Sequence, residues 1–188
     1  MKIGVLALQG DFEAHRKALE RAGAEAVEVR SAKDLEGIDG LVIPGGESTT
    51  MLKLLRAEGL FEPLAEFGRR KPILGTCAGA ILLAREVQSP CQESLGLMNF
   101  TVERNAYGRQ IDSRIVQLRG GEFSEPLEAV FIRAPIIRDV GPDARVLIEY
   151  NGDPVLVEQG KHMVATFHPE LTADPRIHSR FLEKVRKG

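Results

Sequence analysis

The amino-acid sequence predicts an α/β fold of three layers, in which an open, mainly parallel sheet lies between helices and carries an antiparallel extension. Two observations lead to this class. In the first half of the chain, short apolar runs alternate with segments whose apolar residues recur at helical spacing. In the second half, short strand-like runs follow one another through glycine-containing turns. The alternation in the first half is typical of parallel strands joined by helical crossovers.

Buried strands and amphipathic helices are expected in turn through the first half. The strands cover residues 2–8, 25–29, 40–43 and 72–76, and the helices cover residues 12–22, 48–56, 60–70 and 78–86. Asp11 is placed to cap the first helix, and Gly23 to end it. The carboxyl ends of parallel strands meet at one edge of a sheet, where ligands bind. We therefore expect Gln9, the Gly45-Gly46 loop and Cys77 to share that edge.

The second half is expected to consist mainly of strands. They cover residues 95–104, 113–118, 129–132, 146–150, 154–158 and 163–167. The last three form an antiparallel meander, because Asn151-Gly152 is a strong hairpin signal. A final helix is expected at residues 174–187. Since no linker, internal repeat or low-complexity segment interrupts the pattern, residues 1–188 are predicted to form a single domain.

Composition argues against several classes of function. Of the 188 residues, 43% are hydrophobic and 28% are charged, and the formal net charge is -2. This balance is ordinary for a globular domain and provides no positive field that would attract nucleic acid. No apolar run approaches the roughly 20 residues that span a bilayer. We expect neither a nucleic-acid partner nor a membrane partner.

The chain has only 2 cysteines, which is typical of a protein of the reducing cytoplasm. One of them, Cys91, lies in a polar segment and is interpreted as incidental. No cysteine–histidine cluster has the spacing of a zinc site, and no phosphate-binding loop is present. Neither a metal nor a cofactor is expected.

The segment Gly75-Thr76-Cys77-Ala78-Gly79 joins an apolar run to good helix formers. It has the form of a nucleophile elbow, a sharp turn between a strand and a helix with the nucleophile at the corner. The glycines leave room beside the nucleophile, and the N-terminus of a helix favours the reactive thiolate. A buried structural cysteine before an ordinary helix is the alternative.

A histidine and a carboxylate follow the last expected strand in the segment His168-Pro169-Glu170. Pro169 favours an extended His168, and residues two apart in an extended chain face the same side. Glu170 can then orient the imidazole that activates Cys77, as in a catalytic triad. The alternative is a turn histidine followed by a helix-capping acid. The remaining histidines are expected to be structural or partly exposed: His15, His162 and His178.

Together, the cysteine and histidine motifs resemble those of the triad glutamine amidotransferases, which hydrolyse glutamine and pass ammonia to a synthase. Further segments resemble one branch of that family, the glutaminase subunit of pyridoxal 5'-phosphate synthase. These segments are Ala7-Leu8-Gln9-Gly10-Asp11, Pro44-Gly45-Gly46-Glu47-Ser48-Thr49-Thr50, Val102-Glu103-Arg104-Asn105-Ala106-Tyr107-Gly108-Arg109-Gln110 and Phe131-Ile132-Arg133-Ala134-Pro135. The resemblance runs from end to end and implies the flavodoxin-like fold of the class I glutamine amidotransferases.

The resemblance implies that Cys77 is the nucleophile, that His168 is the acid and base, and that Glu170 orients His168. The implied oxyanion hole consists of backbone N–H groups of Gly46 and Ala78. The residues implied to bind L-glutamine are Gly46, Glu47, Ser48, Arg104, Ile132 and Arg133. An amino acid needs a cation for its carboxylate and acceptors for its ammonium, which such a set supplies. From the residues alone, Arg104 would be interpreted as an exposed loop arginine.

The resemblance also implies a partner, a (β/α)8-barrel synthase subunit, and an assembly of twelve glutaminases around a dodecameric synthase. Gln9 can belong either to the oxyanion region or to the interface with this partner. A glutaminase that serves another synthase, such as imidazole glycerol phosphate synthase, would share the triad but not the stretch from Arg104 to Gln110. A non-enzymatic redox sensor would oxidise Cys77, and the charged residues implied to bind glutamine would then have no purpose.

Overall fold

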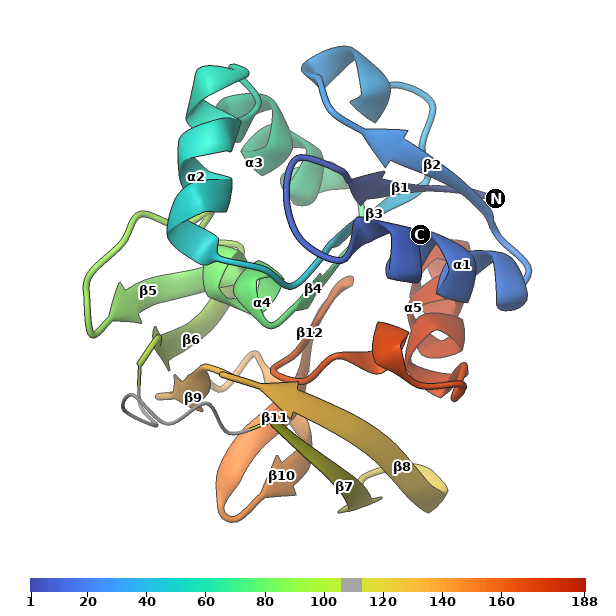
Figure 1. The fold of residues 1–188 in the computed structure, drawn as a ribbon, viewed down its shortest axis with the longest axis vertical. Coiled ribbons are helices and arrows are strands. Elements are labelled where there is room, and N and C mark those ends of the chain that lie inside the picture. Colours follow the sequence, from blue (N-terminus) through green and yellow to red (C-terminus); the bar gives the residue numbers. More distant parts are fainter. Residues whose placement is uncertain (106–112) are drawn as a thin grey trace.

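Strands and helices alternate through the first half of the chain (Figure 1). The computed structural model describes residues 1–105 and 113–188, so residues 106–110 of the branch motif lie outside the described residues. In chain order the elements are β1 (Lys2–Leu6), α1 (Phe12–Arg21), β2 (Glu25–Val29), the short 3-10 helix η1 (Ala32–Leu35), β3 (Gly40–Ile43), α2 (Ser48–Ala57), α3 (Phe61–Arg70), β4 (Ile73–Thr76) and α4 (Ala78–Leu83).

The second half is dominated by strands, as the sequence predicts. It contains β5 (Ala84–Gln88), β6 (Met98–Glu103), β7 (Ser113–Gly120), β8 (Phe123–Ile132), β9 (Ile136–Arg138), β10 (Arg145–Tyr150), β11 (Asp153–Gln159), β12 (His162–Ala165), the 3-10 helix η2 (Pro169–Leu171) and α5 (Arg176–Lys187). Among the described residues, no helix is long and apolar enough to cross a membrane.

The main sheet has 7 strands in the order β10-β11-β12-β4-β3-β1-β2. All neighbours from β12 to β2 are parallel, whereas β10, β11 and β12 pair antiparallel as the predicted meander. Helices α1 and α5 lie on one side of the sheet, and α2, α3 and α4 lie on the other (Figure 1). The order β2-β1-β3-β4-β12 of the parallel part is that of a flavodoxin-like sheet. The predicted fold class is confirmed.

The sheet divides the apolar core into two clusters. On one side, Ile43 of β3 packs in a cluster with Met51 of α2, and on the other side Val5 of β1 packs in a cluster with Phe181 of α5. Leu6, the neighbour of Val5, belongs to the first cluster because successive side chains of a strand point to opposite faces. The inner parallel strands β1, β3 and β4 are covered on both faces and are therefore mostly apolar, which explains the continuous runs in the sequence.

The structure differs from the sequence predictions at short segments. The helix expected at residues 78–86 ends at Leu83, and the chain continues as β5, which pairs with β6. Strand β9 was not predicted and pairs with the other side of β6. Both differences arise because pairing with a distant strand decides the local structure, and a few residues carry no usable periodicity.

Two helix starts also differ from the predictions. The side chain of Asp11 makes no capping hydrogen bond to α1. The last helix begins at Arg176 instead of residue 174, and the Asp174 carboxylate accepts a hydrogen bond from the Arg176 backbone N–H at 3.0 Å. The predicted hairpin turn is present, because Asn151 and Gly152 have φ values of 52° and 83° between β10 and β11.

Candidate active site

Cys77 stands at the corner between β4 and α4 in a strained backbone conformation, with φ 47° and ψ -104°. Positive φ is uncommon for a residue with a side chain and occurs mostly at turns and functional sites. The turn is also tightly packed, because a Cβ atom on Gly79 would lie 2.1 Å from the Ile43 carbonyl oxygen. The local geometry is that of a nucleophile elbow, and the glycine is needed for it.

Sheet pairing brings the two predicted motifs together. Strand β12 lies parallel to β4 with Ala165 opposite Thr76, and the Cys77 backbone N–H donates to the Ala165 carbonyl at 2.9 Å. Both strands therefore end at the same edge, and the chain beyond β12 delivers His168 to Cys77. Strand β8 holds His168 from the other side, because the His168 N–H donates to the Val130 carbonyl at 2.8 Å.

His168 and Glu170 form a buried hydrogen bond, with Nδ1 of the imidazole 2.7 Å from Oε1 of the carboxylate. A carboxylate can only accept, so Nδ1 carries the proton and Nε2 is left to face the nucleophile. The predicted pairing is correct, but its predicted basis is not. Glu170 lies in the 3-10 helix Pro169–Leu171 and not in an extended chain, so the turn itself brings the carboxylate to the ring.

The environment of His168 favours its protonated form. Burial alone would lower the pKa of this histidine, but the neighbouring Cys77 sulfur and Glu170 carboxylate more than compensate and raise its pKa to about 10. A protonated imidazole beside a sulfur is the arrangement that stabilises a thiolate. In the structure the Cys77 sulfur lies 3.9 Å from the Ile132 carbonyl oxygen, and His168 Nε2 has no hydrogen-bond partner among the described residues.

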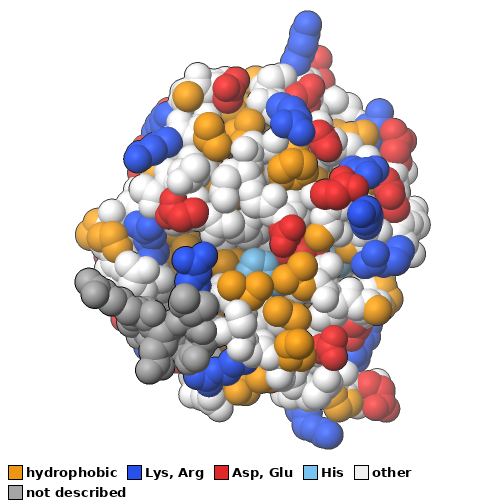
Figure 2. Space-filling view, in the orientation of Figure 1, with side chains coloured by type: hydrophobic (Ala, Val, Ile, Leu, Met, Phe, Trp, Pro, Cys, Tyr) orange, Lys and Arg blue, Asp and Glu red, His pale blue; other side chains and the backbone are white. Residues whose placement is uncertain are grey.

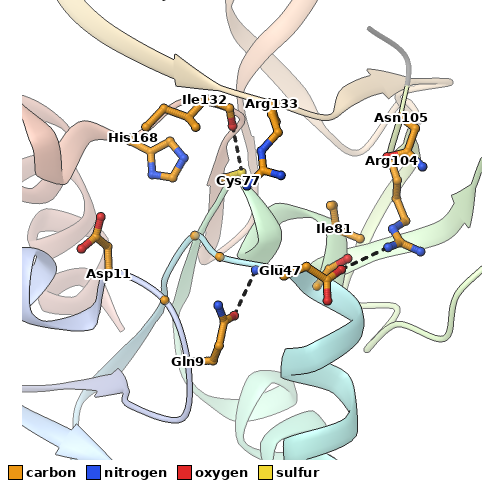
Figure 3. Close-up of a pocket in the computed structure, with 14 residues that line it drawn as sticks. Gln9, Asp11, Glu47, Cys77, Ile81, Arg104, Asn105, Ile132, Arg133 and His168 are labelled. Atoms are coloured by element: carbon orange, nitrogen blue, oxygen red, sulfur yellow. Dashed lines mark hydrogen bonds and ion pairs between the residues drawn. The ribbon is translucent and has the colours of Figure 1, made fainter. Parts of the chain in front are cut away.

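The Gly45-Gly46 loop lies directly against the His168 ring. A Cβ atom on Gly45 would lie 2.4 Å from His168 Cε1. The loop is held from behind by Gln9, whose Oε1 accepts a hydrogen bond from the Glu47 backbone N–H at 3.0 Å (Figure 3). The sequence left two roles open for Gln9, one in the oxyanion region and one at the interface with the partner. The contact observed in the structure is with the loop of the expected oxyanion hole.

Gly45→Ala is expected to lower the rate of the glutamine hydrolysis that the resemblance implies by at least about 100-fold, because the added methyl group displaces the His168 ring and small misplacements of reacting groups have effects of this size. The measurement is ammonia release, with the melting temperature followed in parallel. Gly59→Ala is the control, since a Cβ atom there meets nothing within 4 Å and only its φ of 61° is strained. That variant should lose stability but keep its rate, and a wild-type rate for Gly45→Ala would contradict the expectation.

Glu47 has a structural role that the sequence did not reveal. It precedes α2 as the N-cap residue, and its carboxylate accepts hydrogen bonds from the backbone N–H groups of Thr49 and Thr50 at 3.1 and 2.7 Å. Partial burial opposes ionisation of this carboxyl, but the hydrogen bonds from both threonines outweigh it and lower its pKa to about 2. Glu47 is therefore a fixed negative charge at the pocket.

Arg104 is tethered to the same helix start. Its Nη2 donates to Thr49 Oγ1 at 2.7 Å and lies 3.4 Å from Glu47 Oε1. The side chain is only 12% exposed, so its interpretation as an exposed loop arginine is wrong. The guanidinium is held in a defined place by an acceptor on α2.

Most of the predicted site residues line one pocket of about 390 Å³ at the carboxyl edge of the sheet, whereas Ala78 and Glu170 lie outside its lining. Figure 3 shows Arg133 on the Cys77 side of this pocket and Arg104 on the Glu47 side. A histidine is visible at the centre of this face of the molecule, between hydrophobic and acidic side chains (Figure 2). The lining residues include Gln9, Gly45, Gly46, Glu47, Ser48, Cys77, Arg104, Ile132, Arg133 and His168. This volume suits a ligand the size of an amino acid.

Three further residues of the predicted site lie in different environments: at a helix start, in the interior and at the surface. Ala78 is the first residue of α4, where backbone N–H groups have no acceptor within the helix. Ser48 is buried, and its hydroxyl donates to Gln92 Oε1 at 3.0 Å. Arg133 is exposed and has a φ of 45° at the end of β8. Within the described part of the chain, no group of histidine, cysteine, aspartate or glutamate side chains could hold a metal ion.

The remaining histidines are all buried, so of the two predicted alternatives, structural or partly exposed, partial exposure is wrong. His162 accepts a hydrogen bond from the Ile73 backbone N–H at the opposite end of β4, and its role is structural. His15 was missed as a member of the site, because its Nε2 lies 3.2 Å from Glu170 Oε2. A signal was available, since His15 occupies a position of α1 whose neighbours at helical spacing, Ala18 and Leu19, face the core.

Comparison with known proteins gives close relatives over the whole chain. One is the pyridoxal 5'-phosphate synthase subunit PdxT of Solibacter usitatus (strain Ellin6076), 63% identical over 190 residues, with 98% of this chain and 99% of the relative covered. Another is the subunit of the same name from Koribacter versatilis (strain Ellin345), 57% identical over 192 residues, with 100% and 97% covered.

Solved structures agree with the fold. A crystal structure described as a glutamine amidotransferase matches with a TM-score of 0.91 at 48% identity, covering 98% of both chains. A glutamine amidotransferase from Thermotoga maritima has a TM-score of 0.61 at 17% identity, with 99% of this chain and 91% of that chain covered, and shares the fold.

The family model described as the SNO glutamine amidotransferase family matches residues 5–187, almost the entire length of the chain. The resemblance inferred from the cysteine and histidine motifs is confirmed by this match and by the relatives. The chain belongs to the SNO glutamine amidotransferase family.

Proposed function

We propose that this chain is the glutaminase subunit of a pyridoxal 5'-phosphate synthase, which hydrolyses L-glutamine to glutamate and supplies the ammonia to a synthase partner. The observation that carries this function is that Cys77 and His168 line the same pocket of amino-acid size, while Glu170 binds His168. The relatives that are named as subunits of this synthase cover the chain from end to end.

The mechanism uses the elbow cysteine as nucleophile. The Cys77 thiolate attacks the side-chain carboxamide carbon of glutamine, and the backbone N–H groups of Ala78 and Gly46 stabilise the oxyanion, each donor contributing roughly 3 to 4 kcal/mol. Protonated His168 donates its proton to the leaving nitrogen, so ammonia departs and a γ-glutamyl thioester remains. Neutral His168 then takes a proton from water, the hydroxide attacks the thioester, and glutamate and the cysteine thiolate are released.

Charged side chains of opposite sign around the pocket would bind the α-amino and the α-carboxylate group of glutamine. Arg133 and Arg104 are the cations that would meet the substrate carboxylate. Glu47 stays ionised and supplies a negative charge for the substrate ammonium, while both of its oxygens accept hydrogen bonds from Thr49 and Thr50. Ser48 and the backbone of Gly46 and Ile132 complete the polar lining.

The resting geometry suggests control by the synthase partner. The Cys77 sulfur faces the Ile132 carbonyl, and it must turn toward His168 Nε2 to form the pair of thiolate and protonated imidazole. The Gly45-Gly46 loop is free of side chains and can reorient a peptide N–H into the oxyanion hole. We infer that docking of a (β/α)8-barrel synthase subunit completes both changes, in a cytoplasmic assembly of twelve glutaminases around a twelve-subunit synthase core.

The test measures ammonia release from glutamine by the chain alone and after addition of its synthase partner. We expect the rate to rise at least about 10-fold in the complex, because one correctly placed oxyanion donor is worth at least this factor. A rate for the isolated chain equal to that of the complex would contradict partner-dependent assembly. Absence of glutamine hydrolysis from both would contradict the proposed function itself.

A further inference from the structure

Behind Glu170 lies a buried set of polar side chains that the mechanism above does not use. His15 of α1 is fully buried, with its Nε2 3.0 Å from Thr76 Oγ1 and 3.2 Å from Glu170 Oε2. Its other ring nitrogen, Nδ1, lies 2.9 Å from Nε2 of His178, which is fully buried on α5. His15 thus contacts both the residue that precedes the nucleophile and the carboxylate that orients the base.

The surroundings of His15 determine which of its nitrogens carries the proton. The second carboxylate oxygen, Glu170 Oε2, is buried and receives no aligned hydrogen bond from the described residues. An unprotonated Nε2 would place a lone pair 3.2 Å from this oxygen, which is repulsive. A proton on Nε2 instead attracts the carboxylate while it binds Thr76 Oγ1. The N–H group of His15 is therefore assigned to Nε2.

His178 fixes this tautomer. With the proton of His15 on Nε2, its Nδ1 must accept, so Nε2 of His178 is the donor across the 2.9 Å contact. The remaining His178 nitrogen, Nδ1, is then an acceptor, and it is buried without a partner among the described residues. A buried acceptor left unpaired is less unfavourable than a buried donor left unpaired, which supports the same assignment.

Both histidines are neutral at physiological pH. Burial, followed by the neighbouring His178 and His168, holds the pKa of His15 well below its usual value. Burial, followed by Arg21, lowers the pKa of His178 to about 4. A neutral donor can orient the Glu170 carboxylate without cancelling its charge, whereas a protonated His15 would compete with His168 for that charge.

We propose that His15 is a positioning residue for the catalytic carboxylate, and that its Nε2–H, held in this tautomer by His178, fixes Glu170 so that Oε1 faces His168. The proposal rests on the proposed function, since the orientation of Glu170 affects turnover only if His168 is the acid and base. The polar and titratable groups that face His15 are Thr76 from β4, His168 and Glu170 from the segment after β12, and His178 from α5.

The test compares the wild type with His15→Phe and His15→Gln in the complex with the synthase partner. Phenylalanine keeps the volume of the ring and removes both nitrogens, so we expect kcat to fall about 10- to 100-fold, as for other partners that orient a catalytic ligand, with little change in KM. The alkaline limb of kcat/KM should move to lower pH, because His168 loses support for its imidazolium. The amide side chain introduced by His15→Gln can donate an N–H to Glu170, so this variant should keep most of the wild-type rate.

A proton NMR measurement on the chain alone gives a readout that is independent of turnover. The Nδ1–H proton between His168 and Glu170 should produce a low-field signal in the wild type and in His15→Gln. The signal should weaken or move upfield in His15→Phe. An unchanged signal together with a wild-type kcat and pH profile for His15→Phe would overturn the proposal.

Matched variants separate positioning from general stability. His162→Phe also removes a buried neutral histidine, but at the opposite end of β4, so it should lower the melting temperature and leave kcat and the pH profile unchanged. Equal effects of His162→Phe and His15→Phe would overturn the positioning role. If His15→Phe does not fold, His178→Phe replaces it in the test. The alkaline limb of its kcat/KM profile should move to lower pH, by less than expected for His15→Phe. An unmoved limb would overturn the proposal.

Cys77→Ala, assayed in parallel, distinguishes failure of this proposal from failure of the proposed function. Retained turnover in Cys77→Ala would reject the triad itself. An inactive Cys77→Ala beside a wild-type His15→Phe would reject only the positioning role of His15.

Discussion

Replacement of Cys77 with alanine is expected to lower glutamine hydrolysis by at least about 10⁴-fold, since loss of a nucleophile that acts with a base as one unit has effects of this order. The fold should survive, because the side chain is small and its backbone is fixed by the N–H bond to Ala165 and by the surrounding turn. The measurement is ammonia release by the complex, with the melting temperature as a check of folding. Cys77→Ser should also be nearly inactive, because a serine hydroxyl is not ionised beside His168.

The chain offers a matched control for this experiment. Cys91 is a free, exposed cysteine outside the pocket, and Cys91→Ser should have the rate of the wild type. Mass spectrometry of the quenched reaction should detect a γ-glutamyl thioester on Cys77 and none on Cys91. Turnover that persists in Cys77→Ala would end the proposed mechanism. Oxidation of Cys77 to sulfenic acid without any thioester would favour the redox-sensor alternative instead.

Local sequence signals were sufficient for the parallel half of the fold and for the turn at Cys77. A strand followed by a glycine turn and a helix is a local unit, and the ends of such units meet at one edge whatever the order of the strands. The placement of His168 beside Cys77 depends on a pairing that no local pattern contains. Strand β12 lies next to β4, although β12 arrives from an antiparallel meander at the end of the chain.

Residues whose roles depend on distant contacts could not be assigned from the sequence. Glu47 was expected to face the substrate, but its carboxylate also caps α2, which is visible only once the helix start is known. His15 was expected to be structural or partly exposed, and its role could not be assigned because its partners, Thr76 and Glu170, are far away in the chain. Residues 84–86 were predicted to end a helix, but they form the start of β5 because pairing with β6 outweighs the local helix preference.

Mild acid is expected to destabilise the folded chain markedly, because three of its 4 histidines are buried with lowered pKa values: His15, His162 and His178. Burial lowers the pKa of His162 and of His178 to about 4, and it also lowers the pKa of His15. The unfolded chain, with histidines near pKa 6.5, then binds more protons than the native chain below that pH. This part of the stability is complete above about pH 6.5 and is lost as the pH falls toward 4.

The expected loss between pH 7 and pH 5 is about 2 kcal/mol for each of His162 and His178, a large share of the stability of a typical domain. His168 acts weakly in the opposite direction, because Cys77 and Glu170 outweigh burial and raise its pKa to about 10, so its contribution to stability becomes complete as the pH falls below about 6.5. Most carboxylates with lowered pKa values change protonation only below pH 5. The change in the free energy of unfolding between pH 7 and pH 5 therefore comes mainly from histidines.

Urea unfolding at pH 7, 6 and 5 measures this dependence. His162→Gln removes one titrating group while its amide oxygen can still accept from the Ile73 N–H, so the decline in the free energy of unfolding should be smaller by about 2 kcal/mol over this range. His178→Gln should reduce the decline by a similar amount, and the two reductions should add because the side chains lie in separate parts of the molecule. A free energy of unfolding that is equal at pH 7 and pH 5 would show that these histidines are protonated in the native chain, and it would remove the basis for a neutral His15 behind Glu170.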